Sequence, residues 1–182
     1  LQGFDKGVNK YQKKIDKLIK KTINGFELDL SYFNYYLFDK QKNFFSKKFE
    51  ILFGSPRNKN DKLEKKYFQI ASALQKKFFE ILVHLIKISK KNSKNDNLII
   101  SGGAAMNSVA NGLLDNIPDY KDTWIGYAPD DSGVAIGAGL LANYKFSKNK
   151  RIIKEVKTNY FGPGYNLNST EKILIKNKIN YF

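Results

Sequence analysis

The sequence predicts a mixed α/β fold, on three observations. The segments "LIISGGAAMN" (98–107) and "YAPDDSGVAIGAGLLANY" (127–144) share one order: an apolar strand, a tight turn and the start of a helix. Residues 61–92 repeat apolar side chains at three- and four-residue spacing, which is typical of a long amphipathic helix. Strands that alternate with helices in this way indicate an α/β domain.

The N-terminal segments predict a helix followed by a strand. Residues 8–23 place apolar side chains on one helical face with lysines opposite, and the "NG" pair at 24–25 is expected to end this helix. Residues 26–30, "FELDL", alternate apolar and acidic side chains and predict a short, half-buried strand. The aromatic-rich segment 31–54 is interpreted as core packing and not as a platform for stacking bases.

The helix predicted from Asp61 to about Asn92 has one apolar face. Its members recur every third or fourth residue: Leu63, Tyr67, Ala71, Leu74, Phe78, Leu82 and Leu85. His84 is the only histidine of the chain and stands four residues after Glu80. We expect it to be a surface or half-buried packing residue and not a catalytic one.

Composition excludes several classes of protein. A chain of 182 residues with 42% hydrophobic residues is about one domain and is not disordered. The absence of cysteine excludes disulfides and thiolate metal sites, and the longest apolar run, residues 78–88, is too interrupted to span a membrane. A cytoplasmic protein without a membrane partner is therefore expected. The net charge of +15 is spread over nearly all surface segments, which argues against a nucleic-acid partner.

The first glycine motif has the features of a phosphate- or nucleotide-binding turn. Gly102 and Gly103 lack side chains, so backbone N–H groups can approach an anion, and the next helix would present its positive end to it. Asn107 could donate to a ribose or phosphate oxygen. The alternative is that both glycines merely permit a tight turn and close helix–strand packing.

The second motif, "PDDSG" (129–133), adds two carboxylates to the turn before a helix. Hard divalent cations bind oxygen ligands, and a phosphate-bound cation often takes one or two carboxylates. The alternative is that Asp131 or Ser132 caps the helix. Two such motifs in one short stretch favour a nucleotide site.

A family resemblance extends these motifs over nearly the whole chain. "LIISGGAAMNSVANGLL", "IGYAPDDSGVAIGAGLLA" and "NYFGPGY" resemble the O-carbamoyltransferases of the nodulation-factor and antibiotic-tailoring type. So do "INGFELDLSYF", "FFSKKFEILFGSPR" and "FQIASALQKKFFEILVHLI", in the same order. The resemblance implies a ribonuclease-H-like half of an actin/sugar kinase/heat-shock-ATPase (ASKHA) domain, with added helices.

The resemblance also implies an activity and its site. Members use carbamoyl phosphate and ATP to form carbamoyl-adenylate, and then transfer the carbamoyl group to the hydroxyl of a small acceptor. Asp131 would be the catalytic residue and, with Asp130, would bind a divalent metal, Fe or Mg. The implied nucleotide-binding residues are Gly102, Gly103, Asn107, Ser132 and Gly133.

One departure from the family pattern implies a fragment. The family's metal-binding histidine pair has no counterpart here, because His84 is the only histidine. We therefore expect residues 1–160 to be the second half of the N-terminal domain and residues 161–182 to start a linker to a C-terminal domain. Such a fragment would be inactive alone, and its full-length parent could form a homodimer.

Two other functions remain open at this point. A tRNA threonylcarbamoyl-transferase-like enzyme would share the Asp-x-Gly pattern of Asp131 and Gly133 and would make use of the positive charge. A non-catalytic ASKHA nucleotide-binding module would need only the glycine motifs. The acceptor of a carbamoyltransferase is not encoded in any motif of the sequence.

Overall fold

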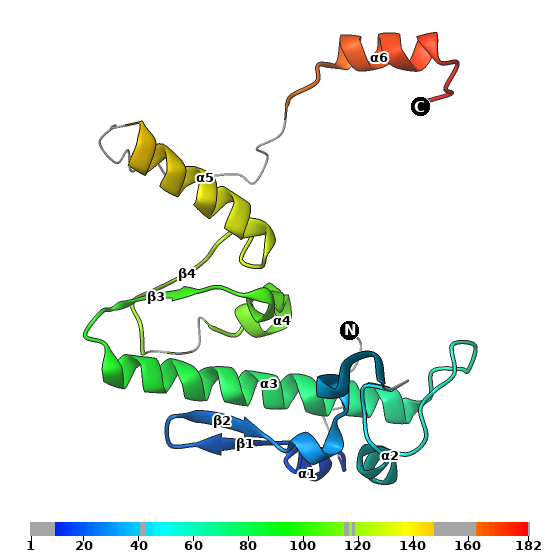
Figure 1. Cartoon of the computed structure of the whole chain (residues 1–182), viewed down its shortest axis with the longest axis vertical. Helices are drawn as coiled ribbons and strands as arrows, with labels where there is room; N and C mark the ends of the chain where they lie inside the picture. The colour runs from blue at the N-terminus through cyan, green and yellow to red at the C-terminus, as the bar shows by residue number, and fades with distance from the viewer. Residues whose placement is uncertain (1–9, 41–42, 115–116, 118, 148–162, 182) are drawn as a thin grey trace. The chain divides into compact units, whose positions relative to one another are not determined.

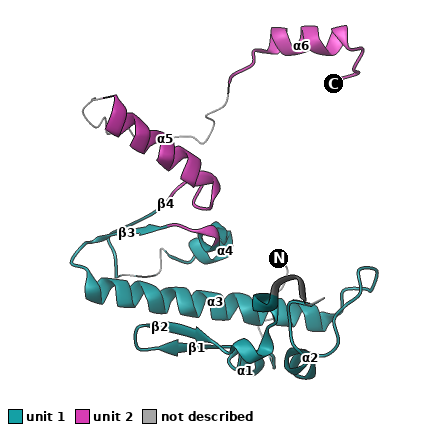
Figure 2. Ribbon diagram, viewed as in Figure 1, with its two compact units in different colours: residues 1–100, 104–124 teal, residues 101–103, 125–182 magenta. Residues whose placement is uncertain are grey.

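The computed structural model describes residues 10–40, 43–114, 117, 119–147 and 163–181 (Figure 1). The chain is mixed α/β, with two small sheets and several helices. It divides into two compact units (Figure 2): unit 1 comprises residues 1–100 and 104–124, and unit 2 comprises residues 101–103 and 125–182. The predicted boundary between residues 160 and 161 lies outside the described residues.

Unit 1 begins with a short helix and a hairpin. Helix α1 (Gln12–Ile15) is followed by strands β1 (Ile19–Thr22) and β2 (Gly25–Leu28), which pair antiparallel from Ile19 opposite Leu28 to Thr22 opposite Gly25. The predicted strand at 26–30 is confirmed as far as Leu28, but it is mostly exposed and not half-buried. The predicted helix over 8–23 is confirmed only at Gln12–Ile15: residues 8 and 9 lie outside the described residues, and residues 19–22 form β1. The loop of the hairpin is Ile23 and Asn24, and Gly25 already belongs to β2. A strand forms where the apolar spacing indicated a helix, because β-branched Ile19 and Thr22 favour an extended backbone before the turn.

The buried core of unit 1 gathers residues from the first helix and the chain on either side of it, from two later helical segments and from the long helix. Tyr11, Ile15 and Leu18 are buried together with Tyr32, Phe53 and Ala73. Two come from the aromatic segment: Tyr32 ends the 3₁₀ helix η1 (Leu30–Tyr32), and Phe53 ends α2 (Lys47–Phe53). The rings of Phe49 and Phe53 lie 4.6 Å apart between centroids. The packing interpretation thus holds for these aromatics, whereas Phe44 is 74% exposed.

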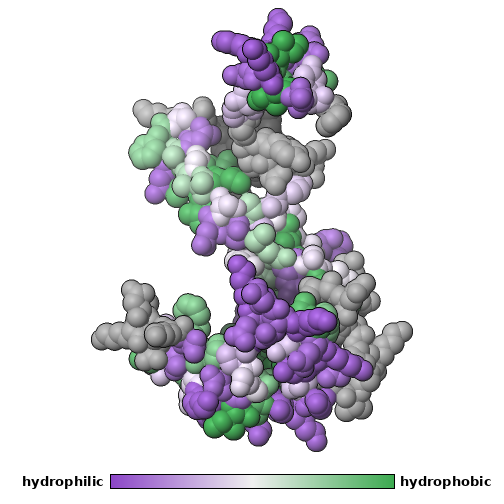
Figure 3. Space-filling view, turned by 90° about the vertical axis from the view of Figure 1, so that its right-hand side faces the viewer, coloured by the Kyte–Doolittle hydropathy of each residue, from purple (hydrophilic) through white to green (hydrophobic). Residues whose placement is uncertain are grey.

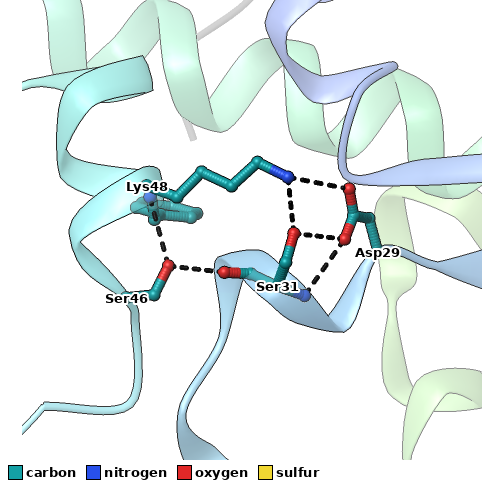
Figure 4. A network of polar contacts seen from close by, with 5 residues as sticks. Asp29, Ser31, Ser46 and Lys48 are labelled. Atoms are coloured by element: carbon teal, nitrogen blue, oxygen red, sulfur yellow. Dashed lines mark hydrogen bonds and ion pairs between the residues drawn. The ribbon is translucent and has the colours of Figure 1, made fainter.

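Polar contacts tie η1 to α2 at the edge of this core (Figure 4). The Lys48 ammonium lies 3.2 Å from an Asp29 carboxylate oxygen and donates to the Ser31 hydroxyl at 2.5 Å. The Ser46 hydroxyl donates to the Ser31 carbonyl and accepts from the amide of Phe49, and so caps α2. Hydrogen bonds from Ser31, with help from Lys48, lower the pKa of the Asp29 carboxyl. A further 3₁₀ helix, η2 (Tyr35–Lys40), follows η1.

The long helix α3 spans Lys65–Asn92, four residues shorter at its start than predicted. Its buried face is formed by Ala73, Lys77 and Ile81, spaced by four residues, with Ile86 further on. The predicted face is wrong, because Leu63 lies before the helix, Ala71 and Leu74 are exposed, and none of the predicted residues is among the buried ones. Apolar residues occur around most of this helix. The buried face was not recognised because Lys77, a charged residue, lies in the middle of it.

Lys77 is a lysine buried among ion-pair partners. Its ammonium lies 2.8 Å from an Asp16 oxygen and 3.3 Å from a Glu80 oxygen, and Glu80 also binds Lys21 at 2.6 Å. Burial alone would lower the pKa of Lys77, but the hydrogen bonds to Asp16 and Glu80 outweigh it and raise that pKa. The hydrogen bond from Lys21, followed by that from Lys77, lowers the pKa of Glu80. The network joins α1, β1 and α3.

The second sheet pairs β3 (Asn97–Ile100) with β4 (Asp122–Ile125). The Lys121 amide donates to the Asp96 carbonyl before the strands, and the Gly102 amide donates to the Pro129 carbonyl after them. The second hydrogen bond joins residues that come later in both segments than those joined by the first, so the two strands run parallel. Their connection carries the 3₁₀ helix η3 (Gly103–Met106) and helix α4 (Ser108–Asn111), as parallel strands require a crossover.

Two further helices follow β4. Helix α5 (Ser132–Phe146) has no buried residue, and its apolar side chains stand at the surface (Figure 3): Val134 is 68% and Leu140 is 59% exposed. Helix α6 (Leu167–Lys176) begins at Asn166, whose side chain accepts from the Ser169 amide. Among the helices of the described part of the chain, none is long and apolar enough to cross a bilayer.

Replacing Lys77 with methionine tests the buried network. Lys77→Met keeps the volume but removes the ammonium, and we expect a loss of about 2 kcal/mol in unfolding free energy at neutral pH. Glu80 has a lowered folded pKa, so its contribution is present above the ordinary value of 4.5 and is lost as the pH falls through the lowered value. The difference between wild type and variant should therefore shrink in acid, as measured by urea unfolding.

The matched control is the neighbouring exposed lysine. Lys76→Met removes the same charge from the same helix and should change stability by no more than about 0.5 kcal/mol. Equal effects of the two substitutions at neutral pH would contradict a stabilising role for the network.

Candidate functional site

The two glycine motifs meet through one backbone hydrogen bond in unit 2. The Gly102 amide donates to the Pro129 carbonyl at 2.5 Å, which places the turn after β3 beside the turn after β4. Gly102 has φ of +99°, in the left-handed region that favours glycine. The tight-turn explanation therefore accounts for Gly102. The Pro129 carbonyl was missed by the sequence analysis, because no motif marks a backbone acceptor.

Gly103 has a different environment. It begins η3, its φ lies outside the left-handed region, and a Cβ built on it meets no atom of the described structure within 4 Å. Close helix–strand packing therefore does not explain this glycine. The open space beside its backbone would admit a ligand group.

The acidic turn contains one carboxylate engaged in local hydrogen bonds. Oδ1 of Asp130 accepts from the Ser132 hydroxyl at 2.5 Å and from the Ser132 amide at 3.3 Å. These hydrogen bonds, chiefly that of the hydroxyl, lower the pKa of the Asp130 carboxyl. The sequence predicted that Asp131 or Ser132 caps α5. This is wrong, because the side chain that accepts hydrogen bonds at the start of α5 is that of Asp130.

Asp131 holds the N-cap position of α5 but makes no capping hydrogen bond with its side chain. It is exposed, and its carboxylate has no hydrogen-bond or ion-pair partner in the described part of the chain. Such a carboxylate is available to a cation. In the described ranges no three histidine, cysteine, aspartate or glutamate residues gather as a metal-binding group. The turn thus carries two carboxylates, of which that of Asp130 is engaged with Ser132 and that of Asp131 is not engaged within the described part of the chain.

Gly133 is needed by the local backbone. A Cβ at this position would lie 2.1 Å from the Ala128 carbonyl oxygen, a distance that no side chain tolerates. Its amide donates to the Asp130 carbonyl at 3.0 Å. Gly133 therefore allows the turn to fold back against the start of α5, whatever its role toward a nucleotide. Gly137 and Gly139, one and two turns on, have open surroundings.

Asn107 lies in unit 1 and is engaged with α3. Its side chain exchanges two hydrogen bonds of 3.0 Å with Gln75, and its oxygen also accepts from the Ala110 amide at the start of α4. Its predicted contact with a nucleotide stays a prediction. The Gln75 partner was missed because the two residues are far apart in sequence.

His84 is half-buried, as expected. Its Nε2 lies 2.8 Å from the Thr22 carbonyl, which links α3 to β1.

Substitutions at the two aspartates should affect stability differently. Asp130→Ala removes the acceptor for Ser132 and should cost about 1 kcal/mol of unfolding free energy. Asp131→Ala removes no hydrogen bond within the described structure and should stay within about 0.5 kcal/mol of wild type. Thermal unfolding followed by circular dichroism measures both. The reverse order would mean that Asp131 is the capping residue.

The glycines of α5 provide a second comparison. Gly133→Ala drives a Cβ into the Ala128 carbonyl, so the backbone must shift, at a cost of about 1–3 kcal/mol. Gly137→Ala adds a Cβ in open space and should stabilise the helix by about 0.5–1 kcal/mol. Helical signal during denaturation reports both changes. A silent Gly133→Ala would show that the close approach to Ala128 is not required.

Comparison with known proteins identifies the family. The family described as carbamoyltransferase N-terminus matches residues 6–140, which includes both glycine motifs. An uncharacterized protein of Synechocystis sp. is 32% identical over 165 residues, or 88% of this chain and 26% of that protein. An uncharacterized protein of Methanocaldococcus jannaschii is 27% identical over 108 residues, or 59% of this chain and 18% of that protein. The chain thus spans about a quarter or less of the length of these relatives, and it belongs to the carbamoyltransferase N-terminus family.

Proposed function

We propose that this chain forms one wall of the nucleotide and metal site of an ATP-dependent O-carbamoyltransferase. The reaction would take the carbamoyl group of carbamoyl phosphate, pass it through carbamoyl-adenylate and transfer it to the hydroxyl of a small acceptor. One observation carries the proposal: the hydrogen bond from Gly102 to Pro129 sets the "SGG" turn beside the "PDDSG" turn. Membership of the carbamoyltransferase family supports the type of group transferred.

The fold that we propose for the complete domain is the ASKHA type, with this chain as part of a ribonuclease-H-like half. Parallel strands β3 and β4 joined by a crossover are compatible with it. In open α/β sheets, ligands bind beyond the carboxyl ends of the strands. Gly102 follows the carboxyl end of β3, and Asp130 and Asp131 follow that of β4.

Each predicted residue has a proposed task. The bare backbone at Gly102 and Gly103 would let phosphate or ribose approach, and Ser132 and Gly133 would offer the start of α5 to the same anion. Asp131 would bind the divalent metal, with Asp130 beside it. The side-chain amide of Asn107 donates one hydrogen to Gln75, and its second hydrogen would be available to the nucleotide.

The donors at the turn match magnesium better than iron. Asp130 and Asp131 supply carboxylate oxygens, and Mg²⁺ is usually held by one or two carboxylates together with substrate phosphates. A bound Mg²⁺ would supply charge neutralisation for the phosphates. The protein residues would hold the phosphates in place.

Asp131→Asn in the full-length protein tests the metal role. Asparagine keeps the shape but removes the negative charge, so carbamoyl transfer should fall by roughly 100-fold while the fold is retained. Because Asp131 makes no capping contact, Asp131→Ala should show the same loss without a loss of stability. Metal content and carbamoyl transfer are measured for both, with Asp122→Asn on the exposed start of β4 as a control. An active, metal-replete Asp131→Asn enzyme would remove Asp131 from the site.

Gly103→Val tests the nucleotide contact. The side chain fits the described structure without a clash, so the fold should be retained, but it would occupy the space proposed for the nucleotide. Affinity for ATP should weaken by about tenfold or more, as measured by calorimetry. Gly25→Val, at an equally open glycine of β2, is the control and should bind ATP normally. Unchanged affinity in a folded Gly103→Val variant would overturn the assignment.

A further inference from the structure

A groove of about 440 Å³ lies in unit 1, in residues to which the proposed reaction assigns no role. One wall is the face of α3 that carries Lys76, Phe79, Val83 and Lys87, and the other is Lys21 of β1. Phe79 and Val83 give it an apolar floor, and the lysine stems continue that floor toward charged ends.

The groove is already formed in the folded unit. Glu80 lines it and holds Lys21 of the hairpin at 2.6 Å, and His84 contacts the Thr22 carbonyl at 2.8 Å. These contacts fix β1 against α3. A ligand would therefore bind without ordering this part of the chain, which lowers the cost of binding.

The charges of the lining residues do not cancel. Lys21, Lys76 and Lys87 bring three ammonium groups, and Glu80 brings the only carboxylate among the seven lining residues. That carboxylate is already shared between Lys21 and Lys77. Lys76 and Lys87 are exposed, and neither has an ion-pair partner in the described ranges. The groove thus has uncompensated positive charge at both ends of an apolar floor.

The spacing of these lysines indicates an elongated ligand. Lys76 and Lys87 are eleven residues apart on one helix, which separates their Cα atoms by about 16 Å along the axis. A single phosphate or carboxylate is too small to occupy both ends, whereas a peptide segment of about three helical turns spans them. A second copy of this chain, with a net charge of +15, is a poor match for such a surface.

We propose that this groove binds an acidic, amphipathic segment of a partner protein. An apolar side chain of the segment packs on Phe79 and Val83, and its carboxylates pair with Lys76 and Lys87. The apolar floor provides affinity, and the lysines at the two ends select for negative charge and set the orientation.

The test uses a labelled acidic peptide about three helical turns long, with leucines on one face, and fluorescence anisotropy with the full-length protein. The double charge reversal Lys76→Glu and Lys87→Glu should weaken binding by about tenfold or more. The matched control is Lys91→Glu with Lys172→Glu, which changes the net charge equally at exposed lysines outside the groove. The control should bind the peptide within about twofold of wild type.

Two further arms separate a groove from a charged surface. Val83→Ser in the protein, or serine in place of the peptide leucines, should also weaken binding, because the apolar contact is lost. Lys76→Gln with Lys87→Gln gives a milder change should the reversal variant fail to fold. The proposal would be overturned if the control pair weakened peptide binding as much as the groove substitutions do. It would also be overturned if a DNA duplex or a phosphatidylserine vesicle bound as tightly as the peptide and lost that binding on substitution of Lys76 and Lys87.

Discussion

The backbone hydrogen bond between Gly102 and Pro129 is the constraint on which the candidate site depends. It lies beyond the ends of both strands and joins the turn after β3 to the turn after β4. Pro129 has no amide hydrogen and takes part only as an acceptor. Gly102 can donate to it because glycine alone adopts its left-handed conformation at little cost. Two turns that are nearly thirty residues apart in the sequence are thereby held together beyond the carboxyl ends of β3 and β4.

Three glycines of the site are explained by three different physical causes. Gly102 is required by its backbone angle, and Gly133 by its contact with the Ala128 carbonyl. Neither cause applies to Gly103, whose angle is ordinary and whose surroundings are open. The folded chain itself does not explain why this position lacks a side chain. The other two glycines are required by the backbone of the turns, so of the three only Gly103 has no explanation within the described structure.

Local signals were predicted well from the sequence, and contacts between distant residues were not. The strand before "SGG" and the helix after "PDDSG" are where their patterns indicate, because apolar runs and turn residues act within a few positions. The strand of the second motif was placed too late in the sequence, because β4 ends at Ile125, before the segment 127–144 begins. The prediction of a helix over 8–23 was wrong beyond its first part. The spacing of Tyr11, Ile15 and Leu18 suits one helical face, but Leu18 reaches the shared core from the loop after α1. The face of α3 was wrong because a buried lysine is rare and depends on Asp16, sixty-one positions away. The capping residue was wrong because adjacent aspartates are equivalent in sequence and differ only in side-chain direction.

The two sheets differ in the length of the loop that must close before their strands can pair. The β1–β2 hairpin closes through residues 23 and 24, whereas the parallel pair waits for the whole connection from 101 to 121. Longer closures cost more entropy and form more slowly, so we expect the hairpin and α3 to form before β3 pairs with β4. In a refolding chain, protection of the Gly102 amide against hydrogen exchange should therefore develop later than the recovery of helical signal.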